Sequence, residues 1–329
     1  MKQYLDLLKE VYDFGVVRKP SRAGMESTKQ LFHRSMEFDL TEGFPIQTTK
    51  RVSYHNVLRE FLWMLKGRVT IQDLIKDKVN IWNDDAFKFY NRKVAAGQTP
   101  LPQLEKEEWL SRAKEDERYC HIGMTYGRQW RNFGGMDIEE PLTGAKFFKI
   151  GCDQITTLFQ NLKNRPDSRY HIVSAWNPTE ISDLQVALPP CHILFSVDVD
   201  PIKGVSLSII QRSADMVLGV PYNIAFYATM VHLIAYYLGK PVNKLYWTGF
   251  YVHIYESHMK VAKEILSRTP HKLPRLDLLP PHPSQYERKE DDGTILLNPK
   301  WFEDITPGDF KLIGYEYDEP VKAPLIVGI

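Results

Sequence analysis

Cys191 is the side chain of this sequence best suited to act as a nucleophile. It follows two prolines in the run Leu188-Pro189-Pro190-Cys191-His192, so the backbone before it is stiff. Arg212 follows about twenty residues later, and a guanidinium near a thiol lowers its pKa and favours the nucleophilic thiolate. A lone cysteine is more often a small buried apolar residue. The combination nevertheless predicts covalent chemistry at Cys191.

Three polar positions after Cys191 could hold a ligand. Arg212 and Ser213 together could bind a phosphate, since guanidinium forms paired hydrogen bonds with phosphate oxygens; a surface ion pair is the alternative for Arg212. Asn223 stands at a predicted helix start, where its amide offers one donor and one acceptor to the edge of a flat heterocycle. A helix cap is the alternative for Asn223.

Other candidates are weaker when taken singly. His253 and Tyr255 point the same way in an extended chain and suit a sugar hydroxyl, although each alone could be a buried polar residue with its own partners. Glu60 lies beside an apolar helical stripe, either in solvent or in a site. The remaining candidates are cations that could contact an anion or simply be solvated: Arg22, Lys50 and Arg51.

These residues must be positioned by a mixture of helices and strands. Apolar spacing predicts helices over 53–66, 153–165 and 221–238. Alternation predicts a strand over 171–176, a hairpin of 192–200 with 205–210, and further strands near 246–248 and 312–315. Residues 84–120 are polar and are expected to form an irregular inserted subdomain or lid, and 270–283 a surface connection. The fold class is α+β, with a sheet built from hairpins and packed on long helices.

Composition narrows the class of protein. The 329 residues carry 42 Lys and Arg against 41 Asp and Glu, a net charge of +1, which argues against a nucleic-acid partner. The 3 cysteines form no disulfide framework, and no secretion signal or membrane-length apolar run occurs. We expect one soluble cytoplasmic domain, in the host cytoplasm if the source is a virus, with no membrane partner.

Taken together, these motifs resemble the thymidylate synthase family. The resemblance covers most of the chain apart from 84–120 and parts of 131–150 and 275–305. It rests on Leu188 to Tyr255 and on seven shorter runs in the same order, which are Glu42-Gly43-Phe44-Pro45, Thr48-Thr49-Lys50-Arg51, Glu60-Phe61-Leu62-Trp63, Asn80-Ile81-Trp82, Tyr126-Gly127-Arg128-Gln129-Trp130, Asp167-Ser168-Arg169 and Ile172-Val173-Ser174-Ala175-Trp176-Asn177.

The resemblance implies a fold and a reaction. It implies a thymidylate synthase-like fold, a large mixed sheet on long helices, that pairs sheet to sheet in a homodimer. It also implies that Cys191 adds to C6 of dUMP and that C5 then takes a one-carbon unit from the co-substrate 5,10-methylenetetrahydrofolate, with no metal. Residues 1–329 would form a single domain with a small insertion at about 84–120.

The resemblance also implies roles for single residues. In the catalytic set, Glu60 would be the general acid/base, His192 and Tyr126 would support the nucleophile, and Asn223 would read the N3/O4 edge of the pyrimidine. Substrate contacts would come from Arg22, Arg212, Ser213, His253 and Tyr255, and from Arg169 donated across the dimer. Asp215 would hold the pterin and contribute to the substrate site. The rest of the folate site would comprise Lys50, Arg51, Trp82 and Ala323.

Three departures from the family pattern bear on which product the reaction would give. Tyr170 stands where a second arginine is usual, Tyr251 stands where an aspartate is usual, and the tail after Pro324 is about two residues longer. All three bear on how the ligands are bound and on how water is kept from the reacting carbon. We therefore favour a deoxyuridylate hydroxymethylase that makes 5-hydroxymethyl-dUMP, as bacterial viruses do for modified DNA. The alternative is thymidylate synthase, which makes dTMP. Two more remote alternatives are a non-catalytic nucleotide- or RNA-binding relative and a cysteine-dependent hydrolase.

Overall fold

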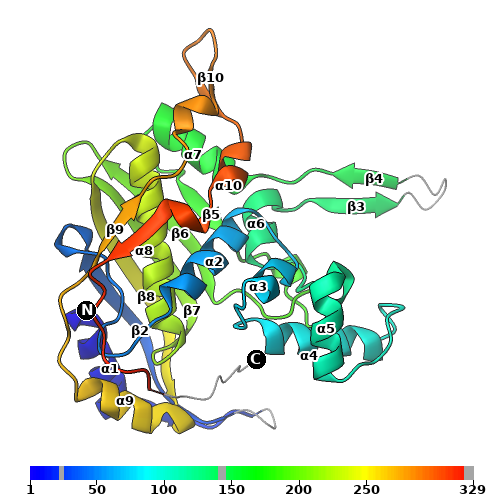
Figure 1. Ribbon diagram of the computed structural model, residues 1–329, viewed down its shortest axis with the longest axis vertical. Helices are drawn as coiled ribbons and strands as arrows, with labels where there is room; N and C mark the ends of the chain where they lie inside the picture. Colours follow the sequence, from blue (N-terminus) through cyan, green and yellow to red (C-terminus); the bar gives the residue numbers. More distant parts are fainter. Residues whose placement is uncertain (22–25, 140–145, 322–329) are drawn as a thin grey trace.

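A six-stranded mixed sheet forms the centre of the molecule. The computed structural model describes residues 1–21, 26–139 and 146–321 (Figure 1). The strand order is β1-β2-β8-β7-β6-β5, and every neighbouring pair is antiparallel except β7 with β8. The strand bounds are β1 (Val16–Arg18), β2 (Thr28–Asp39), β5 (Ile172–Ser174), β6 (His192–Asp200), β7 (Gly204–Asp215) and β8 (Val242–Tyr255).

Helix α8 (Gly219–Leu238) connects the one parallel pair of strands. A parallel pair needs a long crossover, and α8 supplies it by running back along one face of the sheet (Figure 1). Its sequence is apolar on nearly all sides, as suits a helix buried between other elements. The helix ends at Gly239, whose φ of +62° is the left-handed conformation typical of a helix C-terminus. The predicted helix 221–238 and hairpin 192–200/205–210 are confirmed.

Shorter elements surround this core. Helix α2 (Tyr54–Leu65) and helix α7 (Gln154–Asn164) confirm the other two predicted helices to within a residue at each end. Ser53 caps α2 by accepting a hydrogen bond from the backbone of Asn56. The remaining described helices are α1 (Lys2–Phe14), α3 (Gln72–Lys76), α4 (Asn83–Ala95), α5 (Lys106–Glu115), α6 (Tyr126–Asn132), α9 (Met259–Leu266) and α10 (Lys300–Asp304). Three small two-stranded sheets pair β3 (Met136–Glu139) with β4 (Lys146–Lys149), β9 (Arg275–Leu278) with β12 (Phe310–Ile313), and β10 (Glu287–Lys289) with β11 (Ile295–Leu297).

One local prediction was wrong, and another was incomplete. The segment 84–120 is largely helical, because α4 and α5 bury Phe89 and Trp109 between polar outer faces. The ring of Phe87 lies 5.3 Å from that of Trp109, a contact between two helices that the polar composition hides. The connection 270–283 contains strand β9, which pairs with β12 more than thirty residues later.

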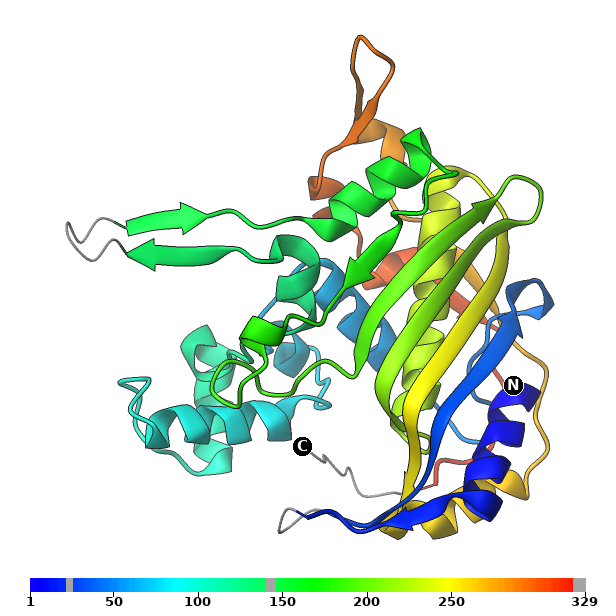
Figure 2. The same cartoon turned by 180° about the vertical axis from the view of Figure 1, so that it is seen from behind.

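The two faces of the central sheet differ. The inner face packs Phe195, Ile209 and Trp247 beneath the helices, all fully buried. In the part of the chain that the structure describes, no helix covers the opposite face over β6, β7 and β8 (Figure 2). Tyr246 is 38% exposed on this outer side. Among the described helices, none is long and apolar enough to cross a membrane.

Candidate active site

Cys191 immediately precedes β6, an interior strand of the sheet, and follows the two prolines Pro189 and Pro190. Its backbone N–H donates to the hydroxyl of Tyr126, the first residue of α6, at 2.6 Å. The Tyr126 ring stacks on the imidazole of His192 with centroids 4.1 Å apart. The residue as a whole is intermediate in exposure, and its thiol forms no disulfide. Cys191 is therefore a free thiol whose backbone is fixed by a buried tyrosine.

Arg212 lies beside Cys191 on the neighbouring strand β7. Its backbone N–H donates to Cys191 O at 2.7 Å, while the guanidinium donates from Nε to Pro190 O at 2.9 Å and from Nη2 to Pro189 O at 2.8 Å. The guanidinium also lies over the ring of Trp176, 5.6 Å from its centroid. These contacts hold a cation close to the sulfur. Ser213 follows, partly exposed, on the same strand.

The electrostatic environment of the thiol is mixed. Burial raises the pKa of Cys191, Arg212 opposes that rise, and the nearby Asp85 carboxylate adds to it. The prediction that Arg212 would favour the thiolate is correct in direction, but the net pKa lies above its usual value. The reason is that desolvation of the thiolate raises the pKa of Cys191 more than the single Arg212 cation lowers it. The thiol of the free protein is thus mainly protonated at neutral pH.

His192 is a neutral structural neighbour of the nucleophile. It is buried, its Nδ1 lies 2.7 Å from the hydroxyl of Tyr227, and burial lowers its pKa to about 3. An imidazole with such a pKa carries no charge at neutral pH. His192 stacks on Tyr126. Because it is uncharged, it does not lower the pKa of the Cys191 thiol.

Asn223 is held in one orientation by a relay of two buried side chains. The indole N–H of Trp247 donates to Gln211 Oε1 at 2.8 Å, and Gln211 Nε2 donates to Asn223 Oδ1 at 2.9 Å. Gln211 Nε2 also donates to Ser213 O at 3.0 Å. Because Oδ1 accepts from Gln211, the Nδ2 group of Asn223 is the end available to donate to a ligand.

Glu60 lies across the site on α2. Trp82 donates its indole N–H to Glu60 Oε1 at 2.8 Å, and the Trp82 ring meets Tyr126 edge-on at 6.3 Å. Burial raises the pKa of Glu60 to about 7, only partly offset by the hydrogen bond from Trp82. A carboxyl with that pKa both takes up and releases protons near neutral pH. The expectation that Glu60 belongs to a site, and not to solvent, is consistent with this burial.

Asp215, His253 and Tyr255 form a second polar group where β7 and β8 end. Asp215 accepts backbone N–H bonds from Val217 at 2.9 Å, Leu218 at 3.2 Å and Gly219 at 3.3 Å, and so holds the turn that leads into α8. Burial acts to raise the pKa of Asp215, but His258, His253 and the Val217 N–H together lower it. The rings of His253 and Tyr255 meet edge-on at 4.9 Å, and both side chains are buried.

The candidate cations lie in different surroundings. Lys50 is 4% exposed and donates to Val217 O at 2.7 Å, and burial lowers its pKa to about 8 although Asp215 opposes this. Arg51 is exposed, with its guanidinium 5.5 Å from the ring centroid of Tyr317. Arg169 is exposed on the loop before β5. Arg22 and Ala323 lie outside the described residues.

The sequence reasoning missed four contributors to this site. Gln211 and Trp176 stood inside motifs that were singled out, but nothing local marked them as partners of Asn223 and Arg212. Tyr227 partners His192 from the middle of α8. Asp85 was read as part of a polar insertion, whereas it is 4% exposed and acts on the pKa of Cys191. Only the tertiary structure brings these side chains to the site.

The described residues around the site can be assessed as ligands for a metal or for a folate. Among the described residues, no cluster of three or more His, Cys, Asp and Glu side chains is arranged to hold a metal. Asp215 already accepts three backbone N–H bonds, and His258 Nδ1 lies 3.7 Å from its Oδ1. The exposed Arg51 suits a ligand with an anionic tail. Lys50, as placed, is directed at Val217 O.

Comparison with known proteins identifies the family. The sequence profile described as thymidylate synthase matches residues 2–327. A protein named thymidylate synthase from Listeria monocytogenes serotype 4a is 39% identical over 347 aligned positions, covering 99% of this chain and 100% of the relative. One of that name from Malacoplasma penetrans is 37% identical over 283 positions, covering 84% of this chain and 89% of the relative. The chain therefore belongs to the thymidylate synthase family, whose members are one-carbon transferases.

Proposed function

We propose that this protein transfers a one-carbon unit to C5 of dUMP through a covalent bond between Cys191 and C6. The observation that carries this proposal is the grouping around the thiol. A free Cys191 is bound through its backbone to Tyr126, and the Arg212 guanidinium lies alongside. The names of the relatives favour dTMP and dihydrofolate as products, so we propose this outcome ahead of hydroxymethylation.

The chemistry follows from the residues. The C5 carbon of uracil is a poor nucleophile until a thiolate adds at C6 and pushes electron density onto C5. Because the pKa of Cys191 is raised, attack requires that its proton leave as the ring binds, and Arg212 stabilises the thiolate at that moment. A phosphate on the substrate would compete with Pro189 O and Pro190 O for the same guanidinium.

Asn223 supports uracil as the base. With Oδ1 accepting from Gln211, Nδ2 is oriented to donate to the O4 carbonyl of uracil, and the second lone pair of Oδ1 can accept from N3–H. Cytosine presents a donor at position 4 and an acceptor at N3, which reverses both requirements. The relay from Trp247 thus favours dUMP over dCMP.

Methylenetetrahydrofolate, when bound, supplies the carbon and, for dTMP, a hydride. We propose that Trp82 lines its site, that Asp215 accepts from its pterin, and that Arg51 contacts its anionic tail. Glu60 moves protons on the pyrimidine beside Trp82, where its pKa of about 7 suits both directions of transfer. We treat residues 1–329 as one catalytic domain with an insertion at about 84–120.

A second candidate product is 5-hydroxymethyl-dUMP. The observations that favour it are Tyr251 in place of the usual aspartate, Tyr170 in place of the usual arginine, and a buried carboxylate, Asp85, beside the nucleophile. Tyr170 is 83% exposed and Tyr251 is 51% exposed.

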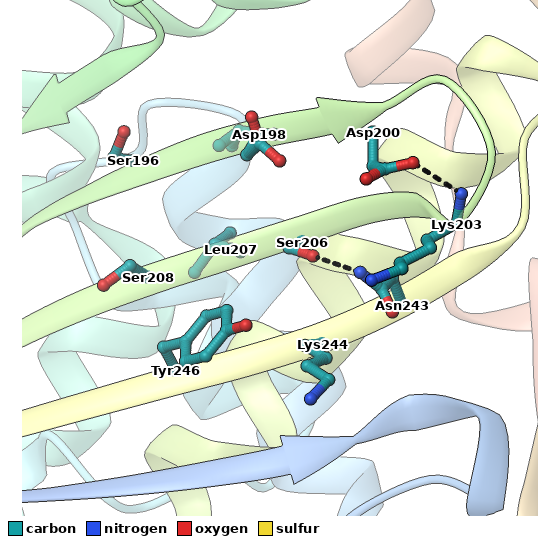
Figure 3. A pocket seen from close by; sticks show the side chains of 11 residues that line it. Ser196, Asp198, Asp200, Lys203, Ser206, Leu207, Ser208, Asn243, Lys244 and Tyr246 are labelled. Atoms are coloured by element: carbon teal, nitrogen blue, oxygen red, sulfur yellow. Dashed lines mark hydrogen bonds between the residues drawn. The ribbon is translucent and has the colours of Figure 1, made fainter.

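We also propose that two copies pair through their sheets. The outer face has a hollow that carries both signs of charge, with Asp198 and Asp200 near Lys203 and Lys244 and the polar pair Ser206 and Asn243 between them (Figure 3). A two-fold axis through such a face brings opposite charges together. The exposed Arg169 would then reach the phosphate in the partner's site.

The decisive experiment is product analysis. The protein is incubated with dUMP and methylenetetrahydrofolate, dihydrofolate is followed by absorbance, and the nucleotides are identified by mass spectrometry. We expect dTMP to rise in step with dihydrofolate. A covalent complex with 5-fluoro-dUMP and the folate should survive denaturation. If neither product nor complex forms at saturating ligands, the protein is a non-catalytic binder.

A further inference from the structure

The inserted helix α4 contacts the chain that leads to the nucleophile. Arg92, near the end of α4, donates from Nε to Asp183 O at 3.0 Å. Its Nη2 donates to Val186 O at 3.2 Å and to Ala187 O at 3.1 Å. The guanidinium also lies over the ring of Phe89 on its own helix, 5.5 Å from the centroid. Because a guanidinium carries its N–H donors in a rigid fork, it fixes these three carbonyl groups relative to one another.

The segment that Arg92 binds has little regular structure of its own. Residues 183–190 contain turns, bends and one isolated bridge residue, and no helix. Backbone carbonyls in such a segment need partners from elsewhere. Arg92 binds three of them, and Arg212 of β7 binds two more, Pro189 O and Pro190 O. Two guanidinium groups from separate elements therefore hold the approach to the nucleophile.

Little conformational freedom separates the carbonyl groups bound by Arg92 from the nucleophile. The rings of Pro189 and Pro190 fix φ at about −65°. Leu188 and Pro189 each precede a proline, and a residue in that position is restricted to extended conformations. A displacement of Ala187 is therefore passed along the chain to Cys191, because the residues between them can absorb little of it.

Helix α4 also joins the two parts of the active site. Trp82 directly precedes the helix and donates to Glu60 Oε1 at 2.8 Å. Arg92 lies ten residues after Trp82, roughly 15 Å along the helix axis at a rise of about 1.5 Å per residue. A single helix thus contacts Glu60 through the residue at its start and the segment before Cys191 through a side chain near its end.

We propose that Arg92 is a positioning residue that fixes the Cys191 sulfur for attack on C6 of the bound nucleotide. This inference rests on the proposed covalent transfer and gives the inserted segment a function in it. Without the guanidinium, three carbonyl groups of 183–190 lose their donor and the segment can shift. Arg212 and Asn223 keep their places, because β7 and α8 carry them.

This difference predicts which step of the reaction depends on Arg92. A displacement of about 1 Å at a reacting atom can slow a reaction by about 10²-fold. The contacts proposed for the nucleotide come mainly from β7, β8 and α8, which Arg92 does not touch through its three hydrogen bonds. Arg92 should therefore determine the rate of covalent addition and have little influence on the affinity for dUMP.

The test compares wild type with Arg92→Met, Arg92→Lys and Lys88→Met. Arg92→Met removes every donor of the side chain, while Arg92→Lys keeps a cation without the planar fork. Lys88→Met is the matched control, because Lys88 is an exposed cation of the same helix and, like Arg92, lowers the pKa of Asp85. Stopped-flow kinetics at saturating 5-fluoro-dUMP and methylenetetrahydrofolate give the rate of covalent addition. Equilibrium dialysis gives the dissociation constant for dUMP, and the final amount of adduct gives the fraction of active protein.

We expect the rate and the affinity to separate. Arg92→Met should slow covalent addition by about 10²-fold, while the dissociation constant for dUMP changes by less than about threefold. Arg92→Lys should be slowed by about tenfold, because an ammonium group cannot bind the three carbonyls in one plane. Lys88→Met should match wild type in both measurements.

Each contrary result has a distinct meaning. An unchanged rate of addition in Arg92→Met overturns the role of Arg92 and leaves the proposed transfer intact. Equal losses of rate and of dUMP affinity also overturn it, since they indicate a general disturbance of the site. A wild type that forms no adduct overturns the proposed function, and the inference with it. If Arg92→Met does not fold, Arg92→Lys decides the question, and addition as fast as in wild type would then contradict the inference.

Discussion

The two sides of the active site are built in opposite ways. On the nucleotide side, which comprises Cys191, Arg212 and Asn223, hydrogen bonds to Tyr126, two proline carbonyls and Gln211 fix each group. On the carboxylate side, which comprises Glu60, Trp82 and Asp85, Glu60 accepts one indole hydrogen bond, and Asp85 Oδ1 accepts none from the residues that the structure describes. The carboxyl pKa values there rise to about 7 and about 6. The groups proposed to recognise a ligand are held by hydrogen bonds, whereas the two carboxyl groups are desolvated by burial.

This difference predicts what each side loses on mutation. Changes on the nucleotide side should affect adduct formation and base choice, because they alter positions. Changes on the carboxylate side should affect pH dependence and stability, because they remove charges that the fold buries at a cost.

The largest effect is expected at the nucleophile. Cys191→Ser should lower kcat by at least about 10⁴-fold, since a hydroxyl is far less nucleophilic than a thiolate. Steady-state rates and the 5-fluoro-dUMP complex measure this directly. Cys152→Ser is the control, because that cysteine is exposed and free. Activity in Cys191→Ser within tenfold of wild type would contradict a covalent mechanism.

The next largest effect is expected at Glu60. Glu60→Gln should lower kcat by about 10²–10⁴-fold. Because burial raises the pKa of Glu60 to about 7, the wild-type rate should show an inflection near that pH, and the variant should not. Glu264→Gln, which alters an exposed carboxylate paired with Arg268, is the control. An unchanged inflection in Glu60→Gln would assign it to another group.

Removing the charge of Asp85 should stabilise the protein at neutral pH. Its folded pKa, raised by burial to about 6 from 3.8, favours folding below pH 3.8, and this contribution is lost as pH rises through 6. Asp85→Asn should therefore be more stable than wild type by about 2 kcal/mol at pH 7.5, and the gap should shrink toward pH 4. Urea unfolding at several pH values measures it. A gap that does not vary with pH would mean that the carboxylate is not desolvated.

The smallest effect is expected in base choice. Gln211→Glu keeps an acceptor for Trp247 but removes the donor to Asn223 Oδ1, so the amide should turn over and present Oδ1 to the base. The preference for dUMP over dCMP, measured as the ratio of kcat/KM values, should fall by about tenfold or more. Gln160→Glu, which contacts Leu297 O far from Asn223 in the sequence, should leave the ratio unchanged. An unchanged ratio in Gln211→Glu would show that the relay does not set specificity.

Much of the scaffold was predictable from local patterns. The helix at 53–66 and the hairpin of 192–200 with 205–210 follow from apolar spacing, because each element buries one face in the common core. The helices of 84–120 were missed, because α4 and α5 are largely polar and meet through a few aromatic side chains, Phe87 and Tyr90 of α4 against Trp109 of α5. A single sequence does not reveal which isolated aromatic residues meet.

By itself, the sequence determined the family and the main chemical groups, since Cys191, Arg212, Asn223 and Glu60 occur in long ordered motifs. Only the tertiary structure decided their electrostatic state. It buries the Cys191 thiol enough to outweigh Arg212, neutralises His192, orients Asn223 through Gln211, and brings Asp85 to the nucleophile. The physical reason is that desolvation depends on everything that surrounds a group, most of which is distant in sequence. Residue types therefore sufficed to predict a covalent step at Cys191, whereas the protonation states of the groups around it depend on the tertiary structure.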